Sequence, residues 1–153
     1  MNDGLDTGQV SHLMGYLVAM AAVHTRRAFQ HSLGGPFDLR TVEFTLLMLL
    51  LKNGSASPKQ LARTLDMPAP NVTALVDKLA ARGLVERRRS STDGRGLQVL
   101  LTGAGLALAQ QAHAQSMHSE AELLQRLSPA EQAMLRELLL KLARTPEARS
   151  SLA

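Results

Sequence analysis

The sequence contains no cysteine and no tryptophan, and its aromatic residues are only Tyr16, Phe29, Phe37 and Phe44. The absence of cysteine excludes disulfide bridges, thiolate metal ligands, a catalytic thiol and thiol-based redox sensing. No aromatic residue lies in the basic middle of the chain. This argues against proteins that stack the bases of RNA or single-stranded DNA on aromatic side chains.

Long hydrophobic runs are also missing. The apolar run Leu46–Leu51, for example, has six residues, whereas a membrane-spanning helix needs roughly 20. The first ten residues contain Asp3 and Asp6 but no lysine or arginine, unlike the start of a secretory signal peptide. The length of 153 residues is close to the roughly 150 of an average domain. We therefore expect a single cytoplasmic domain.

The basic residues are concentrated in the middle of a chain whose net charge is +4. The segment Lys52–Arg95 contains nine basic and four acidic residues, a balance of +5, and the rest of the chain carries −1. Such a segment indicates a module that faces a polyanion. The alternative is a basic surface that is merely solvated.

A glycine-rich break separates the first two predicted helices. Apolar residues recur with helical period from about Gly8 to Leu33, and Gly34-Gly35-Pro36 should end this helix. Asp38 is the expected N-cap of a second helix, which runs to about Lys52. Because the second helix is apolar on nearly all sides, we expect it to be central and buried.

Two helices with a tight break between them come next. Ser57 and the glutamine three residues later form a capping box around a proline, which predicts a helix over Pro58–Leu65. Asp66 tolerates the left-handed backbone that the break requires. A second helix is predicted from Ala69 to Arg82, with a glycine directly after it. This spacing is that of a helix-turn-helix.

Two short β-like runs, Leu84–Ser90 and Gly96–Thr102, follow with an Asp-Gly turn signal between them. A helix-turn-helix followed by a basic two-stranded ribbon is a winged helix, which can place a helix in the major groove of DNA. Thr102 should cap a helix that reaches about Leu127, and a capping box at Ser128 should open a last helix. The predicted fold is mainly α: an α+β winged helix with six helices and a two-stranded β-wing.

Three motifs in this region resemble the MarR family of bacterial transcriptional regulators. They are Leu79-x3-Gly83-Leu84-Val85-x-Arg87, then Asp93-Gly94-Arg95, then Leu100-Leu101-Thr102-x2-Gly105. The sequence departs from the family pattern at Pro68, where serine is common, and at Gly96, where a basic residue is common.

The resemblance implies a division of the chain and an activity. Residues 38–102 would form the DNA-binding lobe, and residues 1–37 and 103–153 would supply dimerisation helices that intertwine with those of a partner subunit. The implied activity is that of a homodimeric repressor that binds a pseudo-palindromic operator in double-stranded DNA. A small aromatic or anionic effector would relieve this binding, and no other cofactor is expected.

The candidate DNA-binding residues fall into three groups. The outer face of the recognition helix comprises Ala69, Pro70, Asn71, Thr73 and Ala74. Asn71 can make a bidentate contact to adenine, although it could instead cap the helix. The phosphate-contact candidates are Ser57, Lys59, Lys78, Arg82 and Arg87, any of which could simply be solvated. The wing candidates are Arg88, Arg89, Asp93 and Arg95. The resemblance implies that Asp93 pairs with Arg95 and that Arg95 enters a minor groove, whereas the alternative is a solvated turn.

Other functions have weaker sequence signals. An effector pocket could use His12, Tyr16, Arg27 and Met48, although methionines at helical spacing are more often core residues. The five histidines have no i,i+4 pair and no HExxH motif, so no metal site is expected, and a histidine-based metal-responsive regulator is an alternative. A winged-helix adaptor for proteins is a further alternative, which the arginines of the wing contradict. No nucleophile elbow or phosphate-binding loop indicates an enzyme.

Overall fold

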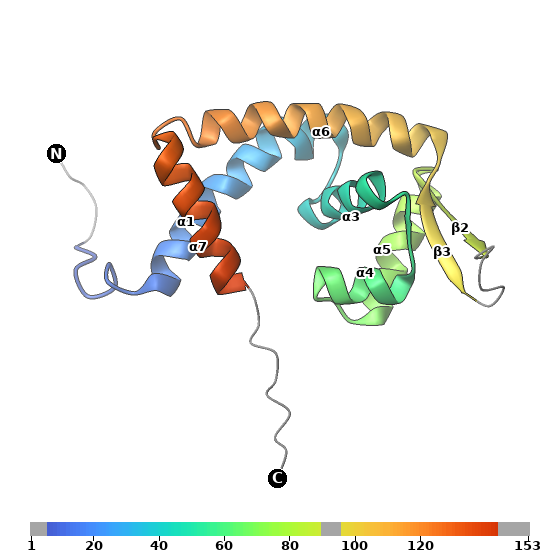
Figure 1. Cartoon of the computed structure of the whole chain (residues 1–153), viewed down its shortest axis with the longest axis horizontal. Helices are drawn as coiled ribbons and strands as arrows, with labels where there is room; N and C mark the ends of the chain where they lie inside the picture. Colours follow the sequence, from blue (N-terminus) through green and yellow to red (C-terminus); the bar gives the residue numbers. More distant parts are fainter. Residues whose placement is uncertain (1–5, 90–95, 144–153) are drawn as a thin grey trace, which may run out of the picture. The chain divides into compact units, whose positions relative to one another are not determined.

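The computed structural model describes residues 6–89 and 96–143, and it confirms a mainly α winged helix (Figure 1). The chain divides into two compact units, Met1–Ser119 and Glu120–Ala153. No helix in the described ranges is long and apolar enough to cross a membrane. The helical elements are α1 (Met14–Phe29), the π-helix η1 (Gln30–Gly34), α2 (Gly35–Phe37), α3 (Thr41–Asn53), α4 (Pro58–Leu65), α5 (Ala69–Ala81), α6 (Gly103–Leu123) and α7 (Pro129–Ala143).

The sheet has three strands, where two were predicted. The expected ribbon consists of β2 (Val85–Arg89) and β3 (Leu97–Leu101), paired antiparallel. A third strand, β1 (Ser55–Ala56), pairs with the other side of β3, which gives the order β1-β3-β2. Two residues between a helix end and a capping box carry no periodic pattern, so β1 had no sequence signal.

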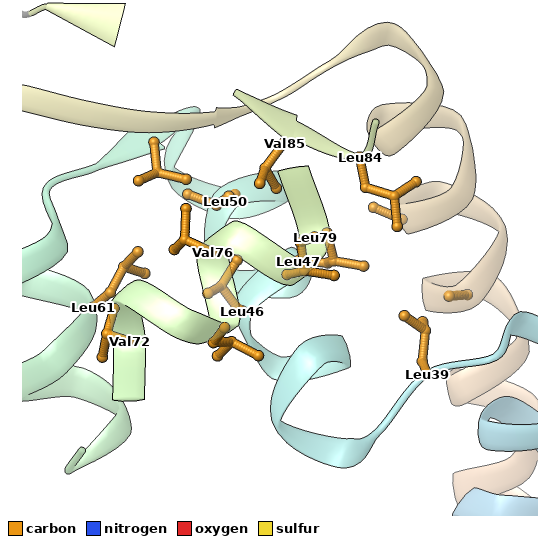
Figure 2. Packing of buried hydrophobic residues seen from close by; sticks show 14 of the residues in the cluster. Leu39, Leu46, Leu47, Leu50, Leu61, Val72, Val76, Leu79, Leu84 and Val85 are labelled. Atoms are coloured by element: carbon orange, nitrogen blue, oxygen red, sulfur yellow. The ribbon is translucent and has the colours of Figure 1, made fainter. Parts of the chain in front are cut away.

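The core of the first unit is built mainly from α3, α5 and the base of the wing. Leu46, Leu47 and Leu50 of α3 are almost completely buried, as the apolar sequence of this helix predicted. Val72 and Leu79 lie on the buried face of α5. Figure 2 shows these side chains converging, with the side chains at the base of the wing closing one end. The core therefore supports the recognition helix directly.

The end of the first helical stretch differs from the prediction. The helix does not stop at Gly34-Gly35-Pro36 but continues as η1 and α2 to Phe37. Asp38 then takes a left-handed conformation with φ 49°, so it ends this stretch and is not the N-cap of α3, which is Arg40. A π-helical turn lies directly ahead of Pro36, a residue that lacks a backbone donor and crowds the carbonyl four residues earlier.

The local signals around the helix-turn-helix are confirmed. The Ser57 hydroxyl oxygen accepts the Gln60 N–H at 3.2 Å, and the Gln60 side chain accepts the Ser57 N–H at 2.8 Å. Asp66 and Gly83 both have positive φ, 50° and 70°. These residues end α4 and terminate α5, so the two helices keep the predicted spacing.

The Leu-Thr-x-x-Gly motif closes the wing onto the start of α6. The Thr102 hydroxyl donates to the Gly83 carbonyl at 2.6 Å and accepts the Gly105 N–H at 3.0 Å, while the Thr102 N–H donates to the Leu84 carbonyl. A Cβ atom at position 105 would lie 1.8 Å from the Leu84 carbonyl oxygen. The glycine is therefore required by the close approach of two backbones.

The second unit contains α7, which opens with the predicted capping box. The Glu131 carboxylate accepts the Ser128 N–H at 2.8 Å, and this bond, with one from the Ser128 hydroxyl, lowers the pKa of Glu131. Gln132 donates to the carbonyls of Leu124 and Leu127, which fixes the preceding turn. No residue of α7 is buried, although the helix contains several large apolar side chains.

Candidate nucleic-acid interface

The recognition helix α5 has one buried face and one open face, and it packs against α4 and β2 (Figure 1). The five residues predicted for the open face are all exposed: Ala69, Pro70, Asn71, Thr73 and Ala74. The N-cap is Pro68, and no side chain caps this end. Within the described ranges the Asn71 side chain has no hydrogen-bond partner, so the structure gives no support to a capping role for it. Its amide is free for a base edge.

The start of α4 presents a hydroxyl and a cation beside this face. Because Ser57 uses its oxygen as an acceptor for the Gln60 N–H, its own O–H proton is available as a donor. Lys59 is exposed in the first turn of α4, and the described contacts give it no ion pair. A helix N-terminus with a donor and a cation is suited to a phosphate.

The first arginine of the wing connects the wing to the recognition helix. Arg87 pairs with Asp77 of α5 at 2.6 Å, and its guanidinium also approaches the Thr73 carbonyl at 3.5 Å. Arg87 and Asp77 line a hollow of about 290 Å³ between α5, the start of α4 and the ribbon. The other residues that line it are Pro58, Val72, Thr73, Val76 and Leu97. Arg87 is therefore a residue of the helix–wing junction as well as a phosphate-contact candidate.

The remaining wing candidates lie farther along the ribbon. Arg88 pairs with Glu86 of the same strand at 2.5 Å, and Arg89 is exposed. Both leave cationic groups at the surface. Asp93 and Arg95 lie outside the described residues, so their predicted pairing stays a prediction.

Besides Arg87, two more of the phosphate-contact candidates pair with acidic residues of the protein. Lys78 pairs at 2.5 Å with Glu43, an acidic residue of α3 that is only 1% exposed, and Arg82 lies 4.0 Å from the same carboxylate. Burial raises the pKa of Glu43, but the Arg40 N–H, Lys78 and Arg82 outweigh this effect and hold the pKa below its ordinary value of 4.5. The carboxylate is therefore charged at neutral pH.

Sequence reasoning missed the role of Glu43. A signal was present, because Glu43 is the one acid in the apolar segment from Thr41 to Leu51. A buried carboxylate needs a cation or several donors. The chain supplies Lys78 and Arg82 four residues apart on one side of α5.

Comparison with known proteins places this arrangement among DNA-binding regulators. The model of the MarR family matches residues 37–96. The multiple antibiotic resistance protein MarR of Salmonella typhimurium is 30% identical over 132 residues, which cover 84% of this chain and 90% of that protein. The chain belongs to the MarR family.

Solved structures of MarR-family proteins agree with this membership. The transcriptional repressor CouR, solved bound to a 23-mer DNA duplex, has a TM-score of 0.84 and 31% identity over 92% of this chain and 99% of that one. A MarR variant from Escherichia coli, solved with operator DNA, has a TM-score of 0.78 and 28% identity over 92% and 100%. This chain is accordingly a MarR-family transcriptional regulator.

The residues predicted for an effector pocket lie ahead of α1, on α1 and on α3. His12 lies ahead of α1, because this helix begins at Met14 and not at about Gly8 as predicted. Arg27 is exposed, and Met48 packs against the core cluster. None of the four lines the hollow between α5 and the wing.

The described part of the chain contains no group of three or more His, Cys, Asp or Glu side chains that could hold a metal ion. At the two positions where the sequence departs from the MarR-family pattern, Pro68 caps α5 with backbone geometry alone, and Gly96 directly precedes β3. Neither departure disturbs the winged helix.

Proposed function

We propose that this MarR-family chain acts as a homodimeric repressor that binds a pseudo-palindromic operator in double-stranded DNA. The observation that carries the proposal is the open face of α5, whose exposed Asn71 amide lies on the same lobe as the cations of α4 and β2. The likeness to a repressor solved on a DNA duplex supports it. The proposed activity is binding, with no catalytic step.

In the proposed complex, α5 enters the major groove and the ribbon lies over the neighbouring backbone. Asn71 reads a base, since asparagine forms two hydrogen bonds with adenine. Ser57, Lys59 and the arginines Arg88 and Arg89 contact phosphates, which position the lobe without reading sequence. The predicted Asp93–Arg95 pair would extend this contact into the minor groove.

The homodimer is supported by apolar side chains that a single chain leaves exposed. On α1 and at its start these are Leu13, Met14, Leu17, Val18 and Met20, and on α7 they are Met134, Leu135, Leu138, Leu139, Leu140 and Leu142. Apolar surface of this kind marks an interface. A two-fold dimer would present two α5 helices to half-sites about one helical turn, roughly 34 Å, apart.

We place the proposed small aromatic or anionic effector at the hollow between α5 and the wing, because the four residues named from the sequence do not line this hollow. Apolar walls from Val72, Val76 and Leu97 meet the Arg87 cation at this hollow. A bound carboxylate would compete with Asp77 for Arg87 and so disturb the junction between α5 and the wing. Benzoate is a simple probe, and it should weaken binding to the operator.

The experiment that tests the proposed function is a salt titration of DNA affinity by fluorescence anisotropy. The operator is first recovered by in vitro selection from random duplexes. Affinity should fall steeply with salt, and Lys59→Ala should reduce the slope by about 0.9 for each lost phosphate contact. Asn71→Ala should instead relax preference at one base pair and cost about 1–3 kcal/mol there. Binding that ignores both salt and duplex sequence would overturn the proposal.

A further inference from the structure

The guanidinium of Arg82 contacts the backbone at the end of the first helical stretch. Its Nη1 donates to the Asp38 carbonyl at 2.6 Å, and its Nη2 donates to the Phe37 carbonyl at 3.2 Å. The Asp38 carboxylate lies 3.8 Å from the same group. One side chain at the C-cap of α5 thus contacts a segment 44 residues earlier in the sequence.

These carbonyls are the groups that a helix end leaves without partners. The stretch α1–η1–α2 ends at Phe37, where Asp38 turns into the left-handed region. Terminal carbonyls and the helix dipole both favour a cation at this point. Arg82 therefore caps one helical stretch while belonging to another, and its two hydrogen bonds to this stretch are both with backbone carbonyls.

The buried carboxylate of Glu43 completes this junction from α3. It accepts the Arg40 N–H at 2.8 Å, pairs with Lys78 and lies 4.0 Å from Arg82. The carboxylate faces the two cations of α5 from the start of α3, directly after the end of α2. Arg82 thus contacts both the end of α2 and the Glu43 carboxylate of α3.

We propose that Arg82 and Glu43 are positioning residues for DNA recognition, which hold α5 at a fixed angle to the first helical stretch and do not themselves contact DNA. The inference rests on the proposed function, because α1 would join the two subunits of the dimer. Asn71 lies at the N-terminal end of α5 and the junction holds the C-terminal end. Fixing that end sets the separation of the two base-reading faces, and so the half-site spacing that the dimer accepts.

The test compares Arg82→Lys, Arg82→Met and Glu43→Gln with the wild-type chain. Anisotropy titrations use the selected operator and two versions with one base pair inserted or removed between the half-sites. Lysine keeps the charge but cannot bridge two carbonyls with a planar fork. If Arg82 positions α5, both Arg82 variants should lose spacing preference at least about tenfold, because neither lysine nor methionine can make both charge-assisted hydrogen bonds at once. Their salt slopes should match the wild type.

A phosphate contact by Arg82 gives the opposite pattern. Arg82→Lys would then keep the wild-type affinity and spacing preference, and Arg82→Met would lower the salt slope by about 1.8 for two subunits. Glu43→Gln separates a charge effect from a positioning effect. If only charge matters, removal of this acid should raise the affinity for all three DNA duplexes alike. If Glu43 positions α5, the variant should lose its preference for the selected spacing. Each preference is a ratio measured on one preparation, so a partly unfolded variant does not distort it.

Arg63→Met is the matched control, because Arg63 is an exposed cation of α4 for which the described residues include no ion pair. It should keep the wild-type spacing preference. If the wild-type chain binds DNA without regard to sequence or salt, the proposed function fails. If the wild-type chain shows both dependences and the Arg82 and Glu43 variants keep its spacing preference, only the positioning role is overturned.

Discussion

The winged lobe and the flanking helices α1 and α7 contain similar side chains and bury them very differently. In the lobe, α3 and α5 each contribute four residues to the buried set. By contrast, α1 and α7 contribute none, although both are rich in leucine, methionine or alanine. Burial within one chain stabilises the lobe, whereas the flanking helices need another surface to cover them. The lobe should therefore fold by its own contacts, and the flanking helices should report on assembly.

The largest expected effect is in the core of the lobe. Leu46→Ala removes a fully buried side chain of α3 and should lower the free energy of unfolding by about 2–5 kcal/mol. Chemical denaturation measures this loss. Leu142→Ala on α7 is the control, because its side chain is 65% exposed and its truncation should change the stability of the lobe little. Equal losses in both variants would contradict the distinction between the two regions.

The next effect is at the contact between the wing and α6. Gly105→Ala would place a methyl group 1.8 Å from the Leu84 carbonyl oxygen, and the overpacking should destabilise the fold by about 1–3 kcal/mol. Gly103→Ala in the same helix meets nothing within 4 Å and should be neutral or slightly stabilising, since alanine favours helix. Thermal unfolding of the two variants separates steric crowding from helix propensity.

The flanking helices should respond through association. Leu17→Lys on α1 or Leu138→Lys on α7 places a charge on apolar surface and should weaken the dimer at least about tenfold, or about 1.4 kcal/mol. Sedimentation equilibrium measures the dissociation constant, and Arg136→Ala on the exposed surface of α7 should leave it near the wild-type value. A wild-type chain that sediments at 16.5 kDa at micromolar concentration would contradict the proposed dimer.

The smallest effect compares two acids with lowered pKa values, Glu43 in the lobe and Glu131 in α7. A pKa lowered in the folded state gives stability that is present above the ordinary pKa and is lost as the pH falls through the folded value. Glu43→Gln should therefore flatten the loss of stability below about pH 4.5, by at most about 1.4 kcal/mol per pH unit for one proton. Glu131→Gln, at an exposed helix cap, should change the dependence of unfolding free energy on acidic pH less than Glu43→Gln does. Chemical denaturation of both variants over a series of acidic pH values measures the difference.

Local chemistry explains which parts of the fold could be predicted. The points where α4, α6 and α7 begin follow from Ser57, Thr102 and Ser128, because an N-capping side chain satisfies backbone groups within three residues of itself. The end of the first helical stretch could not be predicted in this way. Glycine and proline are usual stop signals, but the helical backbone continues through the π-helical turn η1 and then through α2, which contains Pro36. The stretch ends at Asp38, where Arg82 of a distant segment contacts the last carbonyls.

The candidate site was predictable to the extent that helical period decides exposure. The open face of α5, including Asn71 and Thr73, follows from the buried positions between them. The acidic partner of Lys78 and Arg82 could not be predicted from the sequence. The sequence pattern of an amphipathic helix is the same whether its cation faces solvent or a buried acid. Only the packing of α3 against α5 brings Glu43 to them.

The strand order β1-β3-β2 leaves β2 as an outer strand of the sheet, with unpaired backbone donors and acceptors along one side in the described residues. Such an edge is a template for pairing with another chain, and charged side chains are a common protection against aggregation. Arg87, Arg88 and Arg89 lie on this strand. The arginines proposed to contact DNA thus also keep the sheet edge from recruiting further strands. Neutral substitutions at Arg88 and Arg89 should therefore lower the solubility of the protein. Part of any apparent loss of operator binding in such variants would come from aggregation, which lowers the concentration of soluble protein.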